Sequence, residues 1–429
     1  MRGQFPVRLG QMVDLLKRGL VPRLSALLAA VPVLVLEGPR ASGKTAVGSI
    51  LGEMGLVRTL ADLSDPTVRA AAEASPTSFV ENLRTPAFID EAQLVPELTV
   101  AVKRTVDRTG EVGAFILTGS SRLGRAALGG SDPLAGRASR ARLWPMTQGE
   151  LVGRPINVLP SLLGAGRLSG SLPAVAVMDL LARIKRGGLP PLAGLRNTML
   201  DAIRPQLIAE YVEGVLYHEV GRRHDRAELE RTYRYLAATT ACLLNVSSIA
   251  NALGAKRETI RSRLATLDAL FLLHTLAGHR SGEHRTVTAH PKVHAVDTAL
   301  ASWAARVGDE PPAAIWGSLV ETFVINELCA QAGWLADPIT VRHWRDNTRK
   351  LEVDAVLFSE TGQSVAIEVK AGADIRPDDM RGLRAFLEAE AHATRGVVFY
   401  TGGLVLQLDE RIWAVPISAL WTGLSTETR

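Results

Sequence analysis

The chain has 429 residues, 47% hydrophobic and 22% charged, a composition typical of a folded protein of two or three domains. Its 49 Lys and Arg residues against 44 Asp and Glu give a net charge of +5 spread along the chain, which permits a polyanionic partner without requiring one. Two cysteines exclude a disulfide scaffold and a cysteine-rich zinc site, and they favour a cytoplasmic location.

The first element is the apolar segment 24–38, LSALLAAVPVLVLEG, which imitates the core of a signal peptide. It is too short to span a bilayer, and Pro32 divides it into a helical half and a β-branched half. We predict a helix followed by a buried strand, and no membrane partner.

A phosphate-binding motif follows that strand. Gly38 to Thr45, GPRASGKT, has the G-x-x-x-x-G-K-[ST] spacing between an apolar strand and a helical pattern. The glycines let backbone N–H groups point at phosphates, and the helix adds its positive N-terminal end. Lys44 would bind the phosphates, and the Thr45 hydroxyl would bind Mg²⁺. The predicted ATP contacts are Gly38, Pro39, Arg40, Ala41, Ser42, Gly43, Lys44, Thr45, Ala46 and, further along the chain, Ser120.

Two further strands end in polar residues. TPAFIDEAQ (85–93) places Asp90 to hold Mg²⁺ through water and Glu91 to orient or deprotonate the attacking water. GAFILTGSSR (113–122) ends in Thr118, Ser120 and Ser121, which would either sense the γ-phosphate or cap a turn.

The segment 134–151, LAGRASRARLWPMTQGEL, brings three arginines together. Arg137 follows a glycine, and we predict it as an arginine finger for the γ-phosphate of a neighbouring subunit, which ties hydrolysis to a homo-oligomer. The alternative is a solvated basic turn that includes Arg140 and Arg142.

These motifs together resemble the bacterial and archaeal AAA-type ATPases fused to a C-terminal domain of unknown function. The resemblance continues in GGLPPL (187–192), HPKVHAVDTALA (290–301), LVETFVINEL (319–328), EVDAV (352–356), AIEVKAG (366–372) and AVPISALW (414–421), so it covers nearly the whole chain. Two features depart from it. The third strand carries Ser and Thr where many AAA proteins have Asn, and residues 153–195 are unusually rich in Gly, Pro and Leu.

The middle of the chain is predicted to be helical. Residues 200–240 show helical periodicity, and 245–276 match a helix-turn-helix through Ala250, Gly254 and Ile260. Four cations on or near the second helix could contact DNA, although winged-helix units also serve as packing lids; they are Lys256, Arg257, Arg261 and Arg263.

A second candidate site lies near the C-terminus. Asp354 is predicted on one strand, and Glu368 and Lys370 leave the same face of the next strand because they are two residues apart. An α-β-β-β-α-β order with this D…E-x-K spacing is similar to the restriction-endonuclease-like core, PD-(D/E)XK. Asp354, Glu368 and Glu321 of the preceding amphipathic helix would bind Mg²⁺, and Lys370 would stabilise the hydroxide. The alternative is a set of ordinary ion pairs.

We therefore predict an α/β protein with an AAA-type P-loop domain (1–152), a connector with short helices (153–200), a helical and winged-helix domain (201–300) and a restriction-endonuclease-like domain (301–429). The predicted function is an ATPase that uses ATP and Mg²⁺ and acts on nucleic acid, with DNA as partner. The alternative is an ATP-dependent regulatory switch that binds protein or DNA and has no nuclease activity.

Overall fold

The computed structural model describes residues 17–123, 132–193, 198–219, 226–279 and 290–427. Its N-terminal part is a parallel sheet with the strand order β2-β3-β4-β1-β5. The strands are β1 (Val33–Glu37), β2 (Thr59–Asp62), β3 (Ala87–Asp90), β4 (Phe115–Gly119) and β5 (Ala138–Arg142). The four residues Val33 to Leu36 are all buried, as expected for a parallel strand covered on both faces.

Helices cover both faces of this sheet because alternate β1 side chains point to opposite sides. Leu34 and Leu36 pack with α1 (Val21–Leu28) and α2 (Lys44–Glu53). Val33 and Val35 lie in the core formed with α3 (Pro66–Ala74), α4 (Pro76–Asn82) and α5 (Leu98–Thr109). The predicted helix and buried strand of segment 24–38 are confirmed as α1 and β1.

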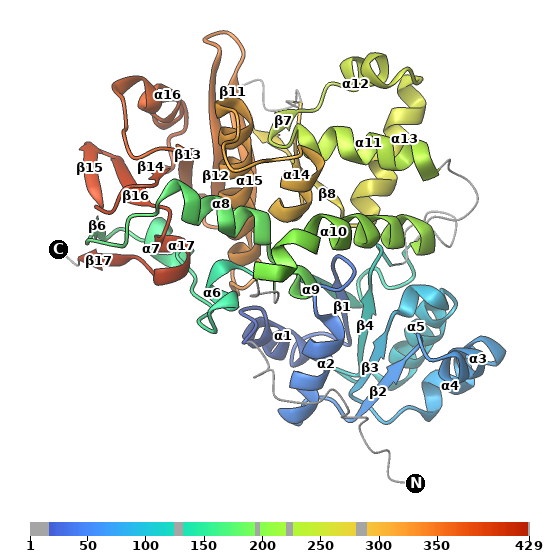
Figure 1. Cartoon of the computed structure of the whole chain (residues 1–429). Helices are drawn as coiled ribbons and strands as arrows, with labels where there is room; N and C mark the ends of the chain where they lie inside the picture. The colour runs from blue at the N-terminus through green and yellow to red at the C-terminus, as the bar shows by residue number, and fades with distance from the viewer. Residues whose placement is uncertain (1–16, 124–131, 194–197, 220–225, 280–289, 428–429) are drawn as a thin grey trace.

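The Gly/Pro/Leu-rich stretch wraps around the C-terminal part of the chain (Figure 1). The short α6 (Gln148–Leu151) precedes it, and it contains α7 (Leu159–Leu163), β6 (Arg167–Ser169), α8 (Val177–Arg186) and α9 (Pro190–Ala193). β6 pairs with the C-terminal strand β17 (Ser425–Glu427), and the Leu172 N–H donates to the Gly403 carbonyl at 2.7 Å. Its leucines share one hydrophobic core with residues up to Trp421, so this stretch is an integral layer of the fold.

The next part begins with two helices, α10 (Thr198–Glu219) and α11 (Arg226–Ala238), where helical periodicity predicts them. A small antiparallel sheet, ordered β7-β10-β8, then accompanies two shorter helices. These elements are β7 (Cys242–Leu243), α12 (Val246–Leu253), α13 (Arg257–Ala269), β8 (Leu273–Leu276) and β10 (Lys292–Ala295), followed by α14 (Thr298–Ala304). Asn245 caps α12, and Gly254 ends it with a φ of +65°.

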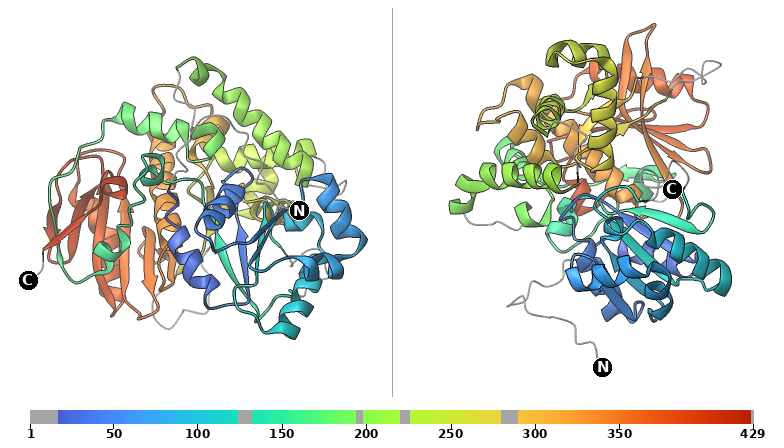
Figure 2. Two further views of the ribbon diagram at one scale, coloured as in Figure 1. Left: turned by 90° about the horizontal axis from the view of Figure 1, so that it is seen from below. Right: turned by 90° about the vertical axis from the view of Figure 1, so that its right-hand side faces the viewer.

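The C-terminal part is a seven-stranded mixed sheet ordered β15-β16-β14-β13-β12-β11-β9, in which β9 (Gly278–His279) comes from the middle of the chain. The remaining strands are β11 (Ile339–Asp346), β12 (Leu351–Ser359), β13 (Ser364–Val369), β14 (Ala393–Tyr400), β15 (Leu406–Asp409) and β16 (Ile412–Pro416). Helix α16 (Arg381–Ala389) packs on β12, β13 and β14, and the short α17 (Ala419–Thr422) follows β16. Figure 2 shows the blue-to-teal N-terminal sheet and the orange-to-red C-terminal sheet in separate parts of the molecule.

Helix α15 (Ala313–Ala332) lies at the centre of this arrangement. By length and composition it is the one helix within the described ranges that could cross a membrane. It packs instead against α7, α8, α14, α17 and the strands β11 and β13, as a core helix does. The sequence predicts an amphipathic helix here, with one apolar and one polar face. In the structure α15 is instead buried on most sides, because other elements pack all around it.

Candidate functional site

The phosphate-binding loop lies between β1 and α2, where the chain turns with Ala41 at φ +60° and Gly43 at φ +96°. A side chain at Gly38 would collide with the Leu143 carbonyl, since a Cβ there would lie 2.3 Å from that oxygen. Lys44 is buried, and its Nζ donates to the Gly38 and Pro39 carbonyls at 3.0 and 3.1 Å. The loop therefore forms a tight backbone cradle with one ammonium group inside it.

Asp90, at the end of β3, meets the first turn of α2. The Thr45 hydroxyl donates to Asp90 Oδ2 at 2.5 Å, and the Thr118 hydroxyl of β4 donates to Asp90 Oδ1. Burial raises the pKa of Asp90, although both hydrogen bonds oppose the shift. A threonine hydroxyl beside a buried carboxylate is the oxygen-donor set that Mg²⁺ prefers, so the residues present fit this ion.

Glu91 follows directly, with a φ of +54° in the left-handed region that a glutamate rarely adopts. Its N–H donates to Thr118 Oγ1 at 3.1 Å, and its carboxylate accepts from the Ser120 hydroxyl at 2.9 Å and from the Gln93 amide at 2.5 Å. Three strand ends thus bring Lys44, Asp90, Glu91 and Ser120 to one edge of the sheet. Gln93, which the sequence argument did not single out, holds both Glu91 and Ser120.

The three arginines around β5 have different surroundings. Arg137 is part-exposed and pairs with Asp107 of α5. Arg140 binds Glu37 and Asp132, each at 2.6 Å. The Arg142 guanidinium stacks on the Trp144 ring, 3.8 Å from its centroid.

Arg18 supports the phosphate-binding loop from behind, a role that the sequence argument missed. It is 8% exposed, and its guanidinium donates to the Ser42 carbonyl at 2.7 Å and to the Trp144 carbonyl at 2.8 Å. Its Nε bonds Glu150 at 2.9 Å, and Glu150 also completes the capping box that starts α6. From the other side, the Tyr211 hydroxyl of α10 donates to the Arg40 carbonyl at 3.0 Å.

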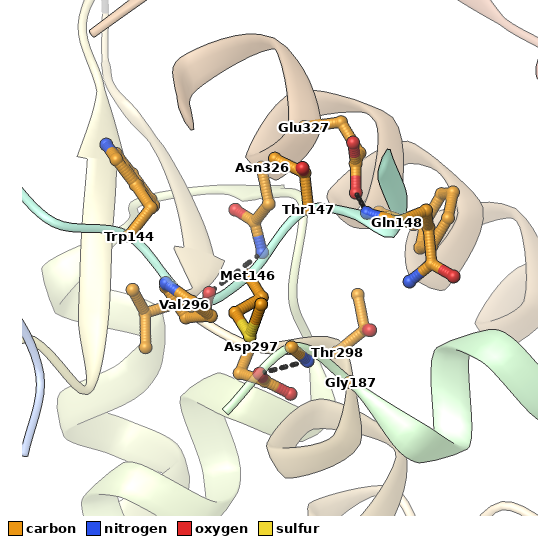
Figure 3. Close-up of a pocket in the computed structure, with 13 residues that line it drawn as sticks. Trp144, Met146, Thr147, Gln148, Gly187, Val296, Asp297, Thr298, Asn326 and Glu327 are labelled. Carbon is orange, nitrogen blue, oxygen red and sulfur yellow. Dashed lines mark hydrogen bonds between the residues drawn. The ribbon is translucent and has the colours of Figure 1, made fainter. Parts of the chain in front are cut away.

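The chain from Trp144 to Gln148 then leads to α15 (Figure 3). The Gln148 N–H donates to Glu327 Oε1 at 2.7 Å, and the Asn326 amide of the same helix donates to the Val296 carbonyl at 3.1 Å. Burial raises the pKa of Glu327 to about 8. The loop and α15 are therefore joined through Arg18, Glu150 and the backbone of residues 144–148.

The C-terminal candidate residues also come together, on α15, β12 and β13. Ala355 lies opposite Ile367 in the antiparallel pairing, which sets Asp354 beside the end of β13, and the Val369 N–H donates to Asp354 Oδ2 at 3.0 Å. Lys370 pairs with Glu368 at 2.9 Å and with Asp379 at 3.2 Å.

A second lysine, absent from the sequence argument, lies inside this cluster. Lys292 begins β10 and is 3% exposed. Its Nζ lies 2.8 Å from Glu321 Oε1 and 3.0 Å from Asp354 Oδ1. A lysine at the start of a short strand, in HPKVHAV, could have indicated a buried charge. Its partners, Glu321 and Asp354, could not be identified from sequence because they lie 29 and 62 residues further along the chain.

The charges of this cluster are balanced internally. Burial, with repulsion from Asp354, raises the pKa of Glu321 to about 8 and raises the pKa of Glu368 well above its usual value. Burial alone would lower the pKa of Lys292, but Asp354 and Glu321 outweigh it and raise the pKa. An ammonium group thus bridges two of the three carboxylates predicted to bind Mg²⁺, so this arrangement does not fit the ion. Within the described residues, no group of three or more His, Cys, Asp or Glu side chains is arranged to hold a metal.

The basic residues of the helix-turn-helix divide into two groups. Lys256, Arg257 and Arg261 are exposed at the start of α13. Arg263, grouped with them by sequence, is buried and contacts Glu228 at 3.3 Å and the Thr232 hydroxyl at 3.1 Å. Its place on α13 turns it toward α11, so it supports helix packing.

Three family models match successive parts of the chain. Residues 30–152 match a family model described as an AAA domain. Residues 178–311 and 316–420 match two models described as domains of unknown function, DUF8612 and DUF4143. The chain therefore carries an AAA-type P-loop ATPase domain, which binds ATP, ahead of a C-terminal DUF4143 domain.

Relatives of similar length exist in mycobacteria. Rv2008c of Mycobacterium tuberculosis and Mb2031c of Mycobacterium bovis are each 26% identical over 414 residues, which is 95% of this chain and 85% of theirs. Among solved structures, the Walker-type ATPase PABY2304 of Pyrococcus abyssi is 14% identical, with a TM-score of 0.37 and coverage of 67% of this chain and 94% of that one. AMPPCP-bound DnaA of Aquifex aeolicus is also 14% identical, with a TM-score of 0.29 and coverage of 58% and 85%.

Proposed function

We propose that this protein is a Mg²⁺-dependent ATPase whose hydrolysis cycle drives a conformational change or an assembly step that acts on nucleic acid. The observation that carries the proposal is the contact between the Thr45 hydroxyl and the buried Asp90 carboxylate at the mouth of the phosphate cradle. In a P-loop ATPase, these two groups hold the magnesium ion that neutralises the phosphates.

The residues around this contact have distinct roles in the proposal. Lys44 exchanges its two backbone carbonyl contacts for the phosphate oxygens of ATP. Glu91, held by Ser120 and Gln93, orients the attacking water and accepts its proton. Because Glu91 is held in a strained left-handed conformation, its carboxylate is positioned before substrate arrives. Arg137 would act on the ATP of a neighbouring subunit after releasing Asp107.

For the rest of the chain we propose a winged-helix unit within residues 201–300 and a restriction-endonuclease-like unit in residues 301–429, with 153–200 between them and the ATPase unit 1–152. The element order α11-β7-α12-α13-β8-β10 supports the first assignment, and the order α15-β11-β12-β13-α16-β14 supports the second. The exposed cations at the start of α13 favour contact with a DNA backbone.

Two substitutions test the ATPase proposal. Lys44→Ala should abolish ATP turnover, and Glu91→Gln should keep ATP binding while turnover falls by about 10² or more. Arg104→Ala, which removes an exposed cation of α5, is the matched control and should leave both unchanged. Full turnover in Lys44→Ala would refute the assignment.

The second candidate is an ATP-dependent regulatory switch that binds DNA or protein and has no nuclease activity. The position of Lys292 between Glu321 and Asp354 favours it, because the ammonium group takes two of the predicted metal ligands. Digestion of single- and double-stranded DNA and RNA with Mg²⁺ or Mn²⁺ separates the two candidates. Cleavage that is lost in Asp354→Ala supports the nuclease, whereas no cleavage by either protein, with and without ATP, supports the switch.

A further inference from the structure

A cavity of about 350 Å³ lies where the ATPase domain meets the other two parts of the chain. Residues from β5, the end of α13, β8, α15 and β11 line it. It lies beside the strand edge of the ATPase sheet, and the phosphate-binding loop is not part of its wall. A smaller cavity of about 200 Å³ adjoins the same strand, and Arg122, Arg140 and Arg142 line both.

Arg142 is the central group of this region. Its guanidinium lies over the Trp144 ring at 3.8 Å and faces the Phe271 ring at 5.1 Å, measured to the centroids. Nε and Nη2 of Arg142 are buried, and neither has a hydrogen-bond partner among the residues that the structure describes. A buried guanidinium donor without an acceptor is costly, because its hydration is lost and nothing replaces it.

The neighbouring cations do not share this situation. Arg122 pairs with Asp268 at 2.6 Å, and Arg140 is held by Glu37 and Asp132. Within the described ranges, no carboxylate lies within ion-pair distance of the Arg142 guanidinium. The cavity therefore contains a guanidinium without a direct ion pair, on which Asp268 and Glu37 act only from a distance. Burial lowers the pKa of Arg142 to about 10, which keeps it charged at neutral pH.

We infer that this cavity is a binding site for a small phosphate-bearing anion, with Arg142 as its principal donor. Guanidinium groups bind phosphate oxygens through two parallel N–H donors. Two donors of Arg142 have no partner among the described residues, and because neither has accessible surface, the guanidinium turns toward the cavity to reach the anion. The volume falls in the range of small-molecule pockets and exceeds what inorganic phosphate needs, so a phosphate monoester with a small organic group fits. Trp144 and Phe271 provide apolar surface beside the guanidinium.

The site lies close to the ATP cradle without sharing its residues. Leu143 follows Arg142, and its N–H donates to the Glu37 carbonyl at 2.7 Å. The Leu143 carbonyl is the atom against which Gly38 packs, and the Trp144 carbonyl accepts from Arg18. An anion that fixes Arg142 therefore fixes the strand end on which the phosphate-binding loop rests.

The test measures anion binding directly and does not depend on ATP hydrolysis. Inorganic phosphate, ribose 5-phosphate and a single-stranded oligonucleotide are titrated by calorimetry at constant ionic strength, all with the full chain carrying Lys44→Ala to weaken the phosphate-binding loop. We expect saturable binding of ribose 5-phosphate. Adding Arg142→Met, which keeps an unbranched stem between Trp144 and Phe271, should weaken it at least tenfold.

Arg84→Met is the matched control, since Arg84 is exposed and does not line the cavity, and it should bind as the parent does. Trp144→Phe gives a second readout that survives if Arg142→Met fails to fold: binding persists, and the tryptophan fluorescence change on ligand addition is lost. The inference would be overturned if the Arg142→Met protein bound ribose 5-phosphate as tightly as the parent, or if the parent showed no saturable binding of either small phosphate. It would also be overturned by an unaltered fluorescence change in Trp144→Phe, or by binding of the oligonucleotide alone.

Discussion

Lys292→Met removes the ammonium group from the C-terminal cluster while keeping an unbranched side chain of similar length. Lys292 has two contacts, a part-buried one of 2.8 Å to Glu321 and a buried one of 3.0 Å to Asp354. At an effective dielectric constant of about 20, each contact with an ionised carboxylate attracts by about 6 kcal/mol, which the cost of desolvating the charges largely offsets. Removing one member of such a group leaves buried charge uncompensated, so we expect a loss of about 3–5 kcal/mol in the free energy of unfolding.

Chemical denaturation at pH 9, above the raised pKa of about 8 of Glu321, measures this loss, and a second substitution identifies its origin. Glu321→Gln in the Lys292→Met background removes one of the stranded carboxylates, so the double variant should recover part of the lost stability. Thr298→Ser, a conservative change at another buried polar residue, is the control. Additive losses in the double variant would contradict the electrostatic explanation.

The same variant tests whether Lys292 takes the place of a metal ion. With the ammonium group gone, Glu321 and Asp354 become available as oxygen ligands, so Mn²⁺ should raise the melting temperature of Lys292→Met and not that of the wild type, both without nucleotide. Wild-type protein that binds Mn²⁺ as tightly as the variant, with binding abolished by Asp354→Asn, would refute the reasoning.

Three further predictions follow from buried contacts. Arg18→Met should destabilise the fold by about 3–5 kcal/mol, because it leaves the buried Glu150 carboxylate without its partner, and it should weaken ATP binding, because it removes the contact with the Ser42 carbonyl. Arg18→Lys should recover part of the stability and part of the affinity, as measured by thermal unfolding and nucleotide titration. Because the pKa of Glu327 is raised in the folded state, the wild type should lose stability as pH rises from about 4.5 to about 8, and Glu327→Gln should not. Across that window the free energy of unfolding of Glu327→Gln should therefore rise relative to the wild type by roughly 3–5 kcal/mol. A stability difference between the two proteins that does not change with pH would contradict this assignment. Gly187→Ala should cost more than the about 1–2 kcal/mol of a left-handed alanine, because Gly187, at φ +67° and ψ −161°, lies in a region that almost only glycine adopts and its Cβ would collide with Asp297 Oδ1. Gly254→Ala, in the left-handed helical region with nothing within 4 Å, should cost only that amount in denaturant titrations.

The ATP site could be predicted from sequence because its signals are local. The loop from Gly38 to Thr45 is continuous, and Asp90 and Glu91 end an apolar run that has to be a strand. Parallel strands present their carboxyl ends at one edge of a sheet, so the convergence of these residues follows once the strands are recognised. The predicted helices at 200–240 depend in the same way on periodicity, and they are present as α10 and α11.

The remaining contacts depend on partners far apart in the chain. Glu150 lies 132 residues from Arg18, and the pairing of β6 with β17 joins segments more than 250 residues apart. A stretch rich in Gly, Pro and Leu lacks clear periodicity, which hides its place as a layer over the C-terminal core. Arg263 shows a further limit, because a cation in a helix-turn-helix pattern can equally face a carboxylate on an earlier helix, here Glu228 of α11.

Helix α15 connects the two candidate sites physically. It carries Glu321, which binds Lys292, and Glu327, which accepts a hydrogen bond from the Gln148 N–H. At about 1.5 Å of rise per residue, Glu321 and Glu327 lie about 9 Å apart along one helix. Residues 144–148 reach back to Arg18 and so to the Ser42 carbonyl of the phosphate-binding loop. A change at the loop that moves this segment must either break the Gln148 contact or move α15, and a movement of α15 displaces Glu321 from Lys292. A double-mutant cycle between Arg18→Lys and Glu321→Gln should therefore show a coupling of about 0.5–2 kcal/mol in ATP binding, and strict additivity would mean that the two sites act independently.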